Sequence, residues 1–142
     1  MSEQNFQNHS RYVAGYHFIT STVILAVIIG SFVNLYHAVP DNHYSAALIC
    51  VISLLLIPFF WYMRAFALRA QDRAIRAEEG LRHLILTGKS LPSGLRMNQI
   101  IALRFASDEE FPALAARAVN ENLSSTDIKK AIQNWRADNH RA

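Results

Sequence analysis

The sequence predicts an all-α protein: a two-span transmembrane helical hairpin, a second span that continues into a long cytoplasmic helix, and a small cluster of about three short helices. Two observations lead to this prediction. Hydrophobic residues make up 51% of the 142 positions, slightly more than soluble domains usually carry. No Asp, Glu, Lys or Arg occurs in residues 12–40 or in residues 42–63, so the apolar residues form two uninterrupted stretches.

Each stretch is long enough to cross a bilayer, whose core of about 30 Å needs about 20 apolar residues. We expect spans over residues 18–36 and 44–63, joined by a short connection that contains Pro40 and favours a tight turn. The chain then divides into an amino-terminal cytoplasmic segment (1–17), the hairpin (18–63), a juxtamembrane helical extension (64–87) and a cytoplasmic helical module (88–142).

A cleaved secretory signal peptide is the alternative interpretation of the first stretch. Its apolar run is longer than the roughly 7–15 residues of a signal-peptide core. The polar segment before it has a single arginine, Arg11, and Tyr36 would stand at the −3 position of a cut after Ala38. We therefore expect residues 18–36 to remain as a permanent helix.

Small residues recur every four positions along the first span: Thr22, Ala26, Gly30 and Asn34. The second span has a matching small face: Ala46, Cys50 and Ser53. Small side chains let helix backbones approach closely. Neither span contains Asp, Glu, Lys, Arg or His, and such residues are the usual mark of an ion pathway. The stripes therefore favour hairpin packing or dimerisation over conduction.

The distribution of arginines predicts the orientation, because basic residues are retained on the cytoplasmic side. Arg11 precedes the first span, and the connection between the spans has no Lys or Arg. Four arginines follow the second span: Arg64, Arg69, Arg73 and Arg76. We expect both termini to be cytoplasmic and these arginines to contact anionic lipid at about 1 kcal/mol each.

Residues 64–87 are expected to continue the second span as a helix. Within them, small and apolar residues recur in alternating steps of three and four: Ala67, Ala70, Ala74, Ala77, Leu81 and Leu84. This heptad-like series, called the seam below, is typical of a close helix contact, with a second copy, another protein or the module of the same chain. Glu78 and Arg82 have the spacing of an ion pair between successive helical turns.

The module begins after a turn at residues 88–94, which contain two glycines and a proline. Its first helix is expected at residues 98–106, and Ser107 with Glu110 resembles a capping box for the next one. We expect the acidic run 108–110 to interact with the amino end of that helix. Ser124 and Asp127 predict the start of a last helix. Its buried face would carry Ile128, Ala131, Ile132 and Trp135.

No sequence pattern indicates catalysis or a bound cofactor. A nucleophile elbow, a Gly-rich phosphate loop and paired Cys ligands are absent from the sequence, whose one cysteine is Cys50. His37, Asp41 and His43 in the connection are the one candidate metal group, and polar residues in a tight solvated loop explain them better. We expect no enzymatic activity, no cofactor and no metal.

Three segments carry a family resemblance. They are RAFALRAQDRAIRAEEGLR (64–82), IALRFASDEEFPAL (101–114) and DIKKAIQNWRAD (127–138). The chain resembles, over roughly residues 9–138, a small family of uncharacterised bacterial two-span membrane proteins, a domain of unknown function. The resemblance implies a bacterial inner-membrane setting and supplies no activity, cofactor or active site.

The function expected from these features is that of a structural or adaptor protein, which presents its helical module for self-association or to a larger membrane complex. A membrane-tethered nucleic-acid binder is an alternative. It would use polar residues of the last helix: Lys129, Lys130, Gln133, Asn134 and Arg136. We do not expect nucleic acid as a partner, because the arginines nearest the membrane supply much of the basic charge. An accessory subunit of a transport complex is a further alternative.

Overall fold

The computed structural model describes Phe6 and residues 13–138. The protein is all-helical, as the sequence predicts, with 76% helix and no strand among the described residues. They form two compact units whose boundary lies between Phe66 and Ala67. Residues 13–66 are called the first unit and residues 67–138 the second unit. Arg11 and most of the expected amino-terminal segment 1–17 lie outside the described residues.

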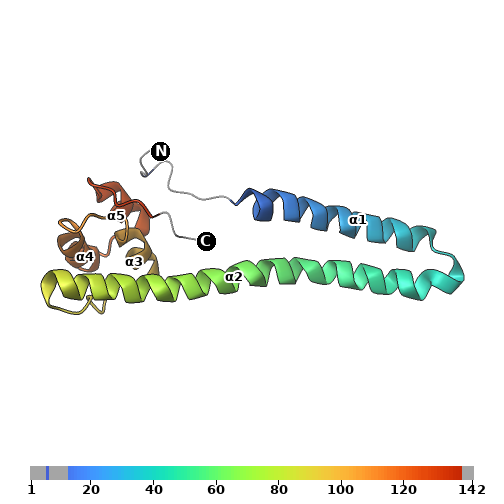
Figure 1. The fold of residues 1–142 in the computed structure, drawn as a ribbon, viewed down its shortest axis with the longest axis horizontal. Helices are drawn as coiled ribbons and strands as arrows, with labels where there is room; N and C mark the ends of the chain where they lie inside the picture. Colours follow the sequence, from blue (N-terminus) through green and yellow to red (C-terminus); the bar gives the residue numbers. More distant parts are fainter. Residues whose placement is uncertain (1–5, 7–12, 139–142) are drawn as a thin grey trace. The chain divides into compact units, whose positions relative to one another are not determined.

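The first unit is built from two long apolar helices (Figure 1). A short π-helix, η1 (Gly15–Thr20), leads directly into α1 (Ser21–His37). A 3-10 turn, η2 (Pro40–Asn42), precedes α2 (His43–Thr87), which runs on into the second unit. Within the described chain, both helices are long and apolar enough to cross a membrane. The expected helices at residues 18–36 and 44–63 are thus confirmed.

The contact between α1 and α2 centres on buried hydroxyl groups. The Ser31 and Ser53 Oγ atoms lie 2.8 Å apart, and the Cys50 thiol donates to the Ser31 carbonyl oxygen over 3.1 Å. The small face expected on the second span is indeed buried, because Ala46, Cys50 and Ser53 are each at most 5% exposed. Close approach of the backbones therefore lets short polar side chains reach across the pair.

The small stripe expected on the first span does not take part in this contact. Thr22, Ala26, Gly30 and Asn34 are all exposed. The inward face is shifted round the helix and is marked by Ser31, which is 4% exposed. Hairpin packing through this stripe, one of the two expected roles, is therefore wrong, because residue size alone does not say which side of an apolar helix meets its neighbour.

The second unit begins with the remainder of α2, which confirms the helical extension over residues 64–87. Gly88, with φ of +70°, ends this helix in the left-handed conformation that glycine adopts without strain. Three short helices follow, as predicted: α3 (Met97–Leu103), α4 (Phe111–Asn120) and α5 (Ser125–Ala131). They gather against the distal part of α2 (Figure 1).

The core of the second unit is formed by Ile100, Leu103, Phe105, Phe111 and Ile128, each at most 1% exposed. Gln99 is equally buried, and both the nitrogen and the oxygen of its side-chain amide have hydrogen-bond partners. Its amide nitrogen donates to the carbonyl oxygens of Ala118 and Leu123, and its oxygen accepts from the Arg96 backbone N–H. A buried amide with all these partners ties α3 to the end of α4.

The start of α5 follows the predicted cap. The Asp127 backbone N–H donates to Ser124 Oγ over 3.1 Å, and the Ser124 hydroxyl donates to the Asp127 carboxylate over 2.6 Å. This hydroxyl holds the pKa of Asp127 below its ordinary value. The cap therefore contributes to stability above the ordinary Asp pKa and is lost as the pH falls through the lowered one.

The last helix is shorter than predicted. It ends at Ala131, and Ile132 is already extended, with ψ of 122°. Residues 132–138 return to α3: the Arg136 N–H donates to the Phe105 carbonyl oxygen over 2.7 Å, and Ala106 forms an antiparallel bridge with Trp135. Trp135 is therefore not on the helical face with Ile128. Its ring packs beside Phe105 at 5.1 Å and stays partly exposed.

Phe105→Ala is expected to destabilise the second unit by about 3–5 kcal/mol, because the ring is fully enclosed and its removal leaves a cavity. Trp135→Ala should cost less, about 1–3 kcal/mol, because water already reaches the indole. Denaturant unfolding of the purified full chain in detergent measures both. Equal losses would contradict the shallow position of Trp135.

Candidate functional site

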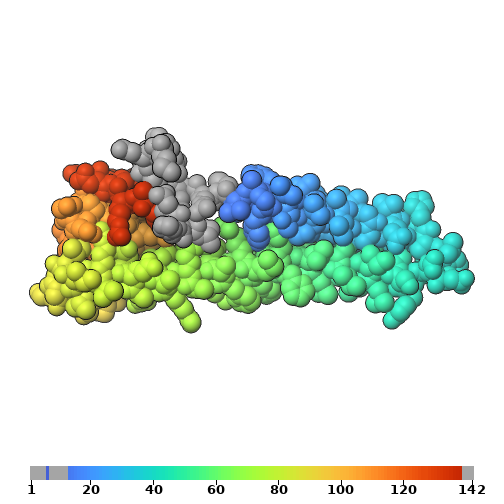
Figure 2. All heavy atoms as spheres, in the orientation of Figure 1, coloured from blue at the N-terminus to red at the C-terminus, as the bar shows by residue number. Residues whose placement is uncertain are grey.

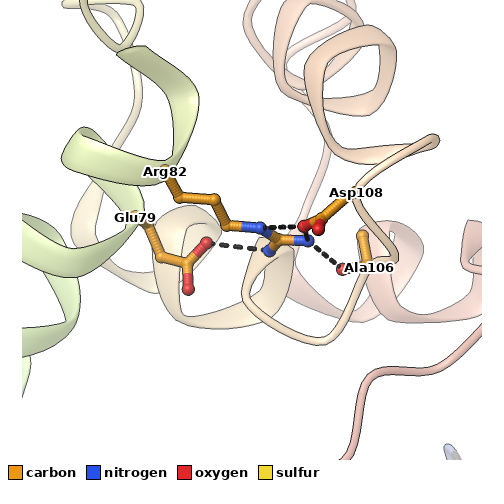
Figure 3. Close-up of polar contacts among 4 residues, drawn as sticks. All are labelled: Glu79, Arg82, Ala106 and Asp108. Atoms are coloured by element: carbon orange, nitrogen blue, oxygen red, sulfur yellow. Dashed lines mark hydrogen bonds and ion pairs between the residues drawn. The ribbon is translucent and has the colours of Figure 1, made fainter. Parts of the chain in front are cut away.

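An ionic cluster, buried at Arg82 and Glu79 but exposed at Asp108, joins α2 to the turn between α3 and α4 (Figure 3). The Arg82 guanidinium donates to Glu79 over 3.0 Å, to Asp108 over 2.7 Å and to the Ala106 carbonyl oxygen over 2.7 Å. The side chains of Arg82 and Glu79 are only 10% and 8% exposed. Charge-assisted bonds in such a place are strong, and their loss is costly.

Aromatic packing surrounds the cluster. The guanidinium carbon of Arg82 lies 4.4 Å from the centre of the Phe111 ring. The His83 ring meets the same phenylalanine edge-on at 5.9 Å, and its Nδ1 lies 2.9 Å from the Lys89 carbonyl oxygen. Ile75 completes this side of α2 in the core. We call the side marked by Ile75, Glu79, Arg82 and His83 the packing face of α2.

The expected pair of Glu78 with Arg82 is wrong. Arg82 pairs with Glu79 instead, one position further along and on the packing face, while Glu78 is exposed. Both glutamates have a spacing that allows a pair on a helix, so spacing alone does not distinguish them. The tertiary partners of the guanidinium, Asp108 and the Ala106 carbonyl oxygen, lie on the side of α2 that carries Glu79.

The acidic run after α3 does not form the expected capping box, because the N-cap residue Glu110 makes no side-chain hydrogen bond to the first turn of α4. Glu110, expected to close a capping box with Ser107, accepts three hydrogen bonds from the returning segment. They come from the backbone N–H groups of Gln133 and Asn134, at 3.1 and 2.8 Å, and from the Asn134 amide at 3.0 Å. Asp108 and Glu110 thus hold two distant parts of the chain to one turn.

The seam lies away from the packing face and is exposed. None of Ala67, Ala70, Ala74, Ala77 and Leu81 is buried by the rest of the chain. Glu79 follows Ala74 by five positions, which places it about 140° round the helix. Figure 2 shows the orange and red atoms of α4 and α5 on one side of the yellow-green stretch of α2. Packing of the seam against the module of the same chain, one of the expected contacts, is therefore wrong.

The seam ends in large apolar side chains. Leu81, Leu84 and Ile85 are 59%, 47% and 74% exposed. A cleft of about 350 Å³ opens beside them, between α2 and the turn that follows it. Its walls include Gly80, Leu81, Leu84, Leu91 and Pro92, with Arg76, Ser90 and Ser93 around them. An apolar cleft next to exposed leucines is typical of a contact surface.

The four arginines expected to contact lipid lie along α2 as predicted. Arg69, Arg73 and Arg76 are exposed. Arg64 is partly buried, and its guanidinium carbon lies 5.7 Å from the centre of the Tyr16 ring.

The described residues include two further polar groups, a cleft in the second unit and the side chains around the connection between the helices. A polar cleft of about 450 Å³ in the second unit is lined by charged residues and their neighbours: Ile75, Glu78, Glu79, Arg104, Arg136, Ala137 and Asp138. In it, Arg104 pairs with Asp138 at 3.0 Å. His37, Asp41 and His43 are each exposed, and within the described part of the chain no group of three His, Cys, Asp or Glu residues is placed to hold a metal.

Arg82→Ala is expected to lower the free energy of unfolding by about 3 kcal/mol, because it leaves the Glu79 carboxylate enclosed without its counter-ion. Arg117→Ala is the matched control. It removes a pair with Glu121 in which both side chains are about half exposed, and should cost less than about 0.5 kcal/mol. Chemical denaturation of both variants measures the difference. If both variants lost a similar free energy of unfolding, the ionic cluster would not be the main attachment of the module to α2.

The comparisons with known proteins give a family and no activity. No curated protein and no solved structure matches the chain. The model of one family, described as a family of unknown function, matches residues 1–142, the whole chain. This agrees with the resemblance carried by the three segments quoted above. The protein belongs to this family of unknown function, DUF6526.

Proposed function

We propose that this protein is a non-enzymatic adaptor of the bacterial inner membrane. Its two apolar helices form a membrane hairpin with both termini in the cytoplasm. The second unit is a cytoplasmic module, and the seam on α2 is the surface through which it associates with itself or with a larger membrane complex.

The exposed surface of the first unit supports the membrane part of the proposal. Large apolar side chains point outward along both helices, among them Phe18, Ile52 and Trp61 at 62%, 61% and 72% exposure. Such a surface is unfavourable in water and favourable in lipid. The contact between the helices is polar and satisfied through Ser31 and Ser53, as expected where no water is available.

Charge and aromatic side chains support the orientation. The connection between the helices, at residues 37–43, has no Lys or Arg, whereas basic residues flank the other end of the hairpin. Tyr16 stacks on Phe60 at 4.1 Å and lies beside Arg64 at that same end. An aromatic group next to a basic one suits the boundary between lipid and cytoplasm.

The observation that carries the adaptor proposal is the two-sided use of α2. One side holds the module through Ile75, Glu79 and Arg82, and the other side leaves the alanines and Leu81 exposed. A helix that holds the module on one side and leaves an apolar side exposed opposite has one more contact to make than its own chain supplies.

The nucleic-acid alternative assumed five polar residues on one exposed helix, and they do not all lie on a helix. Because α5 ends at Ala131, it carries only Lys129 and Lys130 of the five expected polar residues. The backbones of Gln133 and Asn134 are held by Glu110 in the extended segment. We therefore retain the adaptor as the proposed function.

Cysteine labelling tests the topology. In a Cys50→Ser background, Asn42→Cys should react with an impermeant maleimide from the periplasm, because residue 42 lies in the connection between the helices. Lys89→Cys, in the turn after α2, should react only after the membrane is permeabilised. Labelling of Lys89→Cys from outside would refute the orientation, and recovery of the protein in the soluble fraction would refute the hairpin.

Ala74→Leu tests the seam. The larger side chain should separate the associating helices and weaken the assembly by about tenfold or more. Stability of the single chain should change by less than about 0.5 kcal/mol, because Ala74 is exposed. Ala116→Leu, at an exposed alanine of α4, is the matched control. Mass in mild detergent and thermal unfolding measure both effects. An assembly unchanged in Ala74→Leu would contradict the adaptor function.

A further inference from the structure

We propose that the occupant of the seam is a second copy of this chain, with the two α2 helices parallel and in register. The inference rests on the proposed function, since it names the partner of that surface. It is carried by the apolar end of the seam, by two charges beside it and by the shape of the cleft next to Gly80.

The apolar end of the seam gives the pair its main driving force. Leu81, Leu84 and Ile85 are exposed to about half or more, and they lie on the side of α2 opposite the packing face. The alanines extend the same heptad spacing towards the hairpin. Leucines at one end and alanines along the rest are compatible with two closely spaced parallel helices.

Two charges flank the seam in complementary positions. With Ala67, Ala74 and Leu81 as the first residues of successive heptads, Arg73 takes the last position of a heptad and Glu78 the fifth of the next. In a parallel pair, a residue in the last position faces the one five places later on the partner. Arg73 of each copy therefore faces Glu78 of the other.

These two residues have no such contact within one chain. They are five positions apart on one helix, about 140° round its axis, and both are exposed. An antiparallel pair would bring last positions together, so that Arg73 would face Gly80 or Phe66 and would gain no opposite charge. The charges thus favour the parallel arrangement, which two hairpins inserted alike in one membrane also require.

The same register places the Ile85 side chain of one copy opposite the cleft at Gly80 of the other. Gly80 and Ile85 are related as Arg73 and Glu78 are, by five positions. Ile85 is the most exposed apolar side chain of the seam end, at 74%, and the cleft of about 350 Å³ opens at Gly80. A Cβ atom at Gly80 would meet no atom within 4 Å, so there is room. Ile85 of the second copy enters this space between Leu81, Leu84 and Leu91.

Charge reversal tests the pairing. Full-length protein in mild detergent is studied by sedimentation equilibrium, with the dissociation constant of the dimer as the readout. Arg73→Glu and Glu78→Arg should each raise it by about tenfold, because two attractive contacts become two repulsive ones. The double variant should return it to within about threefold of the wild type. Lys130→Glu, the same charge change at an exposed residue of α5, away from the seam and the cleft, should leave it unchanged.

Disulfide cross-linking tests the parallel pair without a measurement of the dimer dissociation constant. In the Cys50→Ser background, Ala74→Cys should form a disulfide with its counterpart under mild oxidation in membranes, because its position lies on the axis of the pair. Arg76→Cys, about 160° away round the helix, should not.

The outcomes separate this inference from the proposed function. A monomeric wild type, or a double variant as weak as the single ones, would overturn the parallel pair. If the purified assembly instead holds one copy of this chain with a different membrane protein, and Ala74→Leu releases it, the adaptor function stands and the second copy is excluded.

Discussion

The guanidinium group of Arg82 is the contact on which the second unit depends. It lies on α2, yet its partners Asp108 and Ala106 belong to the turn between α3 and α4. The same turn receives the returning segment, since Glu110 binds the backbone of Asn134 and Phe105 accepts from Arg136. One arginine and one short turn therefore connect the long helix, the three short helices and the extended residues. Phe111 packs against the guanidinium, and water is largely excluded from the Arg82–Glu79 pair, which strengthens that bond.

Different residue types on α2 make the contacts of its two parts. In the first unit, the contacts are made by Ala46, Cys50 and Ser53, and every hydroxyl at the contact has a partner. In the second unit, the packing face combines an apolar side chain, Ile75, with charged ones. We relate this contrast to the proposed setting: lipid offers no hydrophobic force between helices, so small side chains and short hydrogen bonds carry the contact. Beyond it, water is present, and burial of apolar surface contributes as usual.

Features that depend on neighbouring residues in the sequence were predictable. The two apolar helices, the extension to Thr87, the number of short helices and the cap at Ser124 all match their predictions. The first and last short helices end earlier than predicted, at Leu103 and Ala131. The errors concern choices made by distant residues. The helix after Ser124 stops at Ala131 because residues on either side of Trp135 find hydrogen-bond partners at Phe105 and Ser107. No local sequence pattern signals such a short bridge. The exchange of Glu78 for Glu79 as partner of Arg82 has the same origin. At the candidate site, the residues of the seam were predictable from their spacing, whereas their exposure was not, because a heptad series does not say whether its own chain covers it.

The contact of Trp135 and Arg136 with Phe105 also determines when the second unit can finish folding during synthesis. The Phe105 carbonyl oxygen has its hydrogen-bond donor in the Arg136 N–H, which is synthesised 31 positions later. At translation rates of about 5–20 residues per second, this takes roughly 2–6 seconds. For that interval Phe105 has no cover from Trp135, while α1 and α2 are already synthesised. A chain truncated between α5 and Trp135 would carry both apolar helices and an open core, the kind of surface that cellular proteases and chaperones recognise.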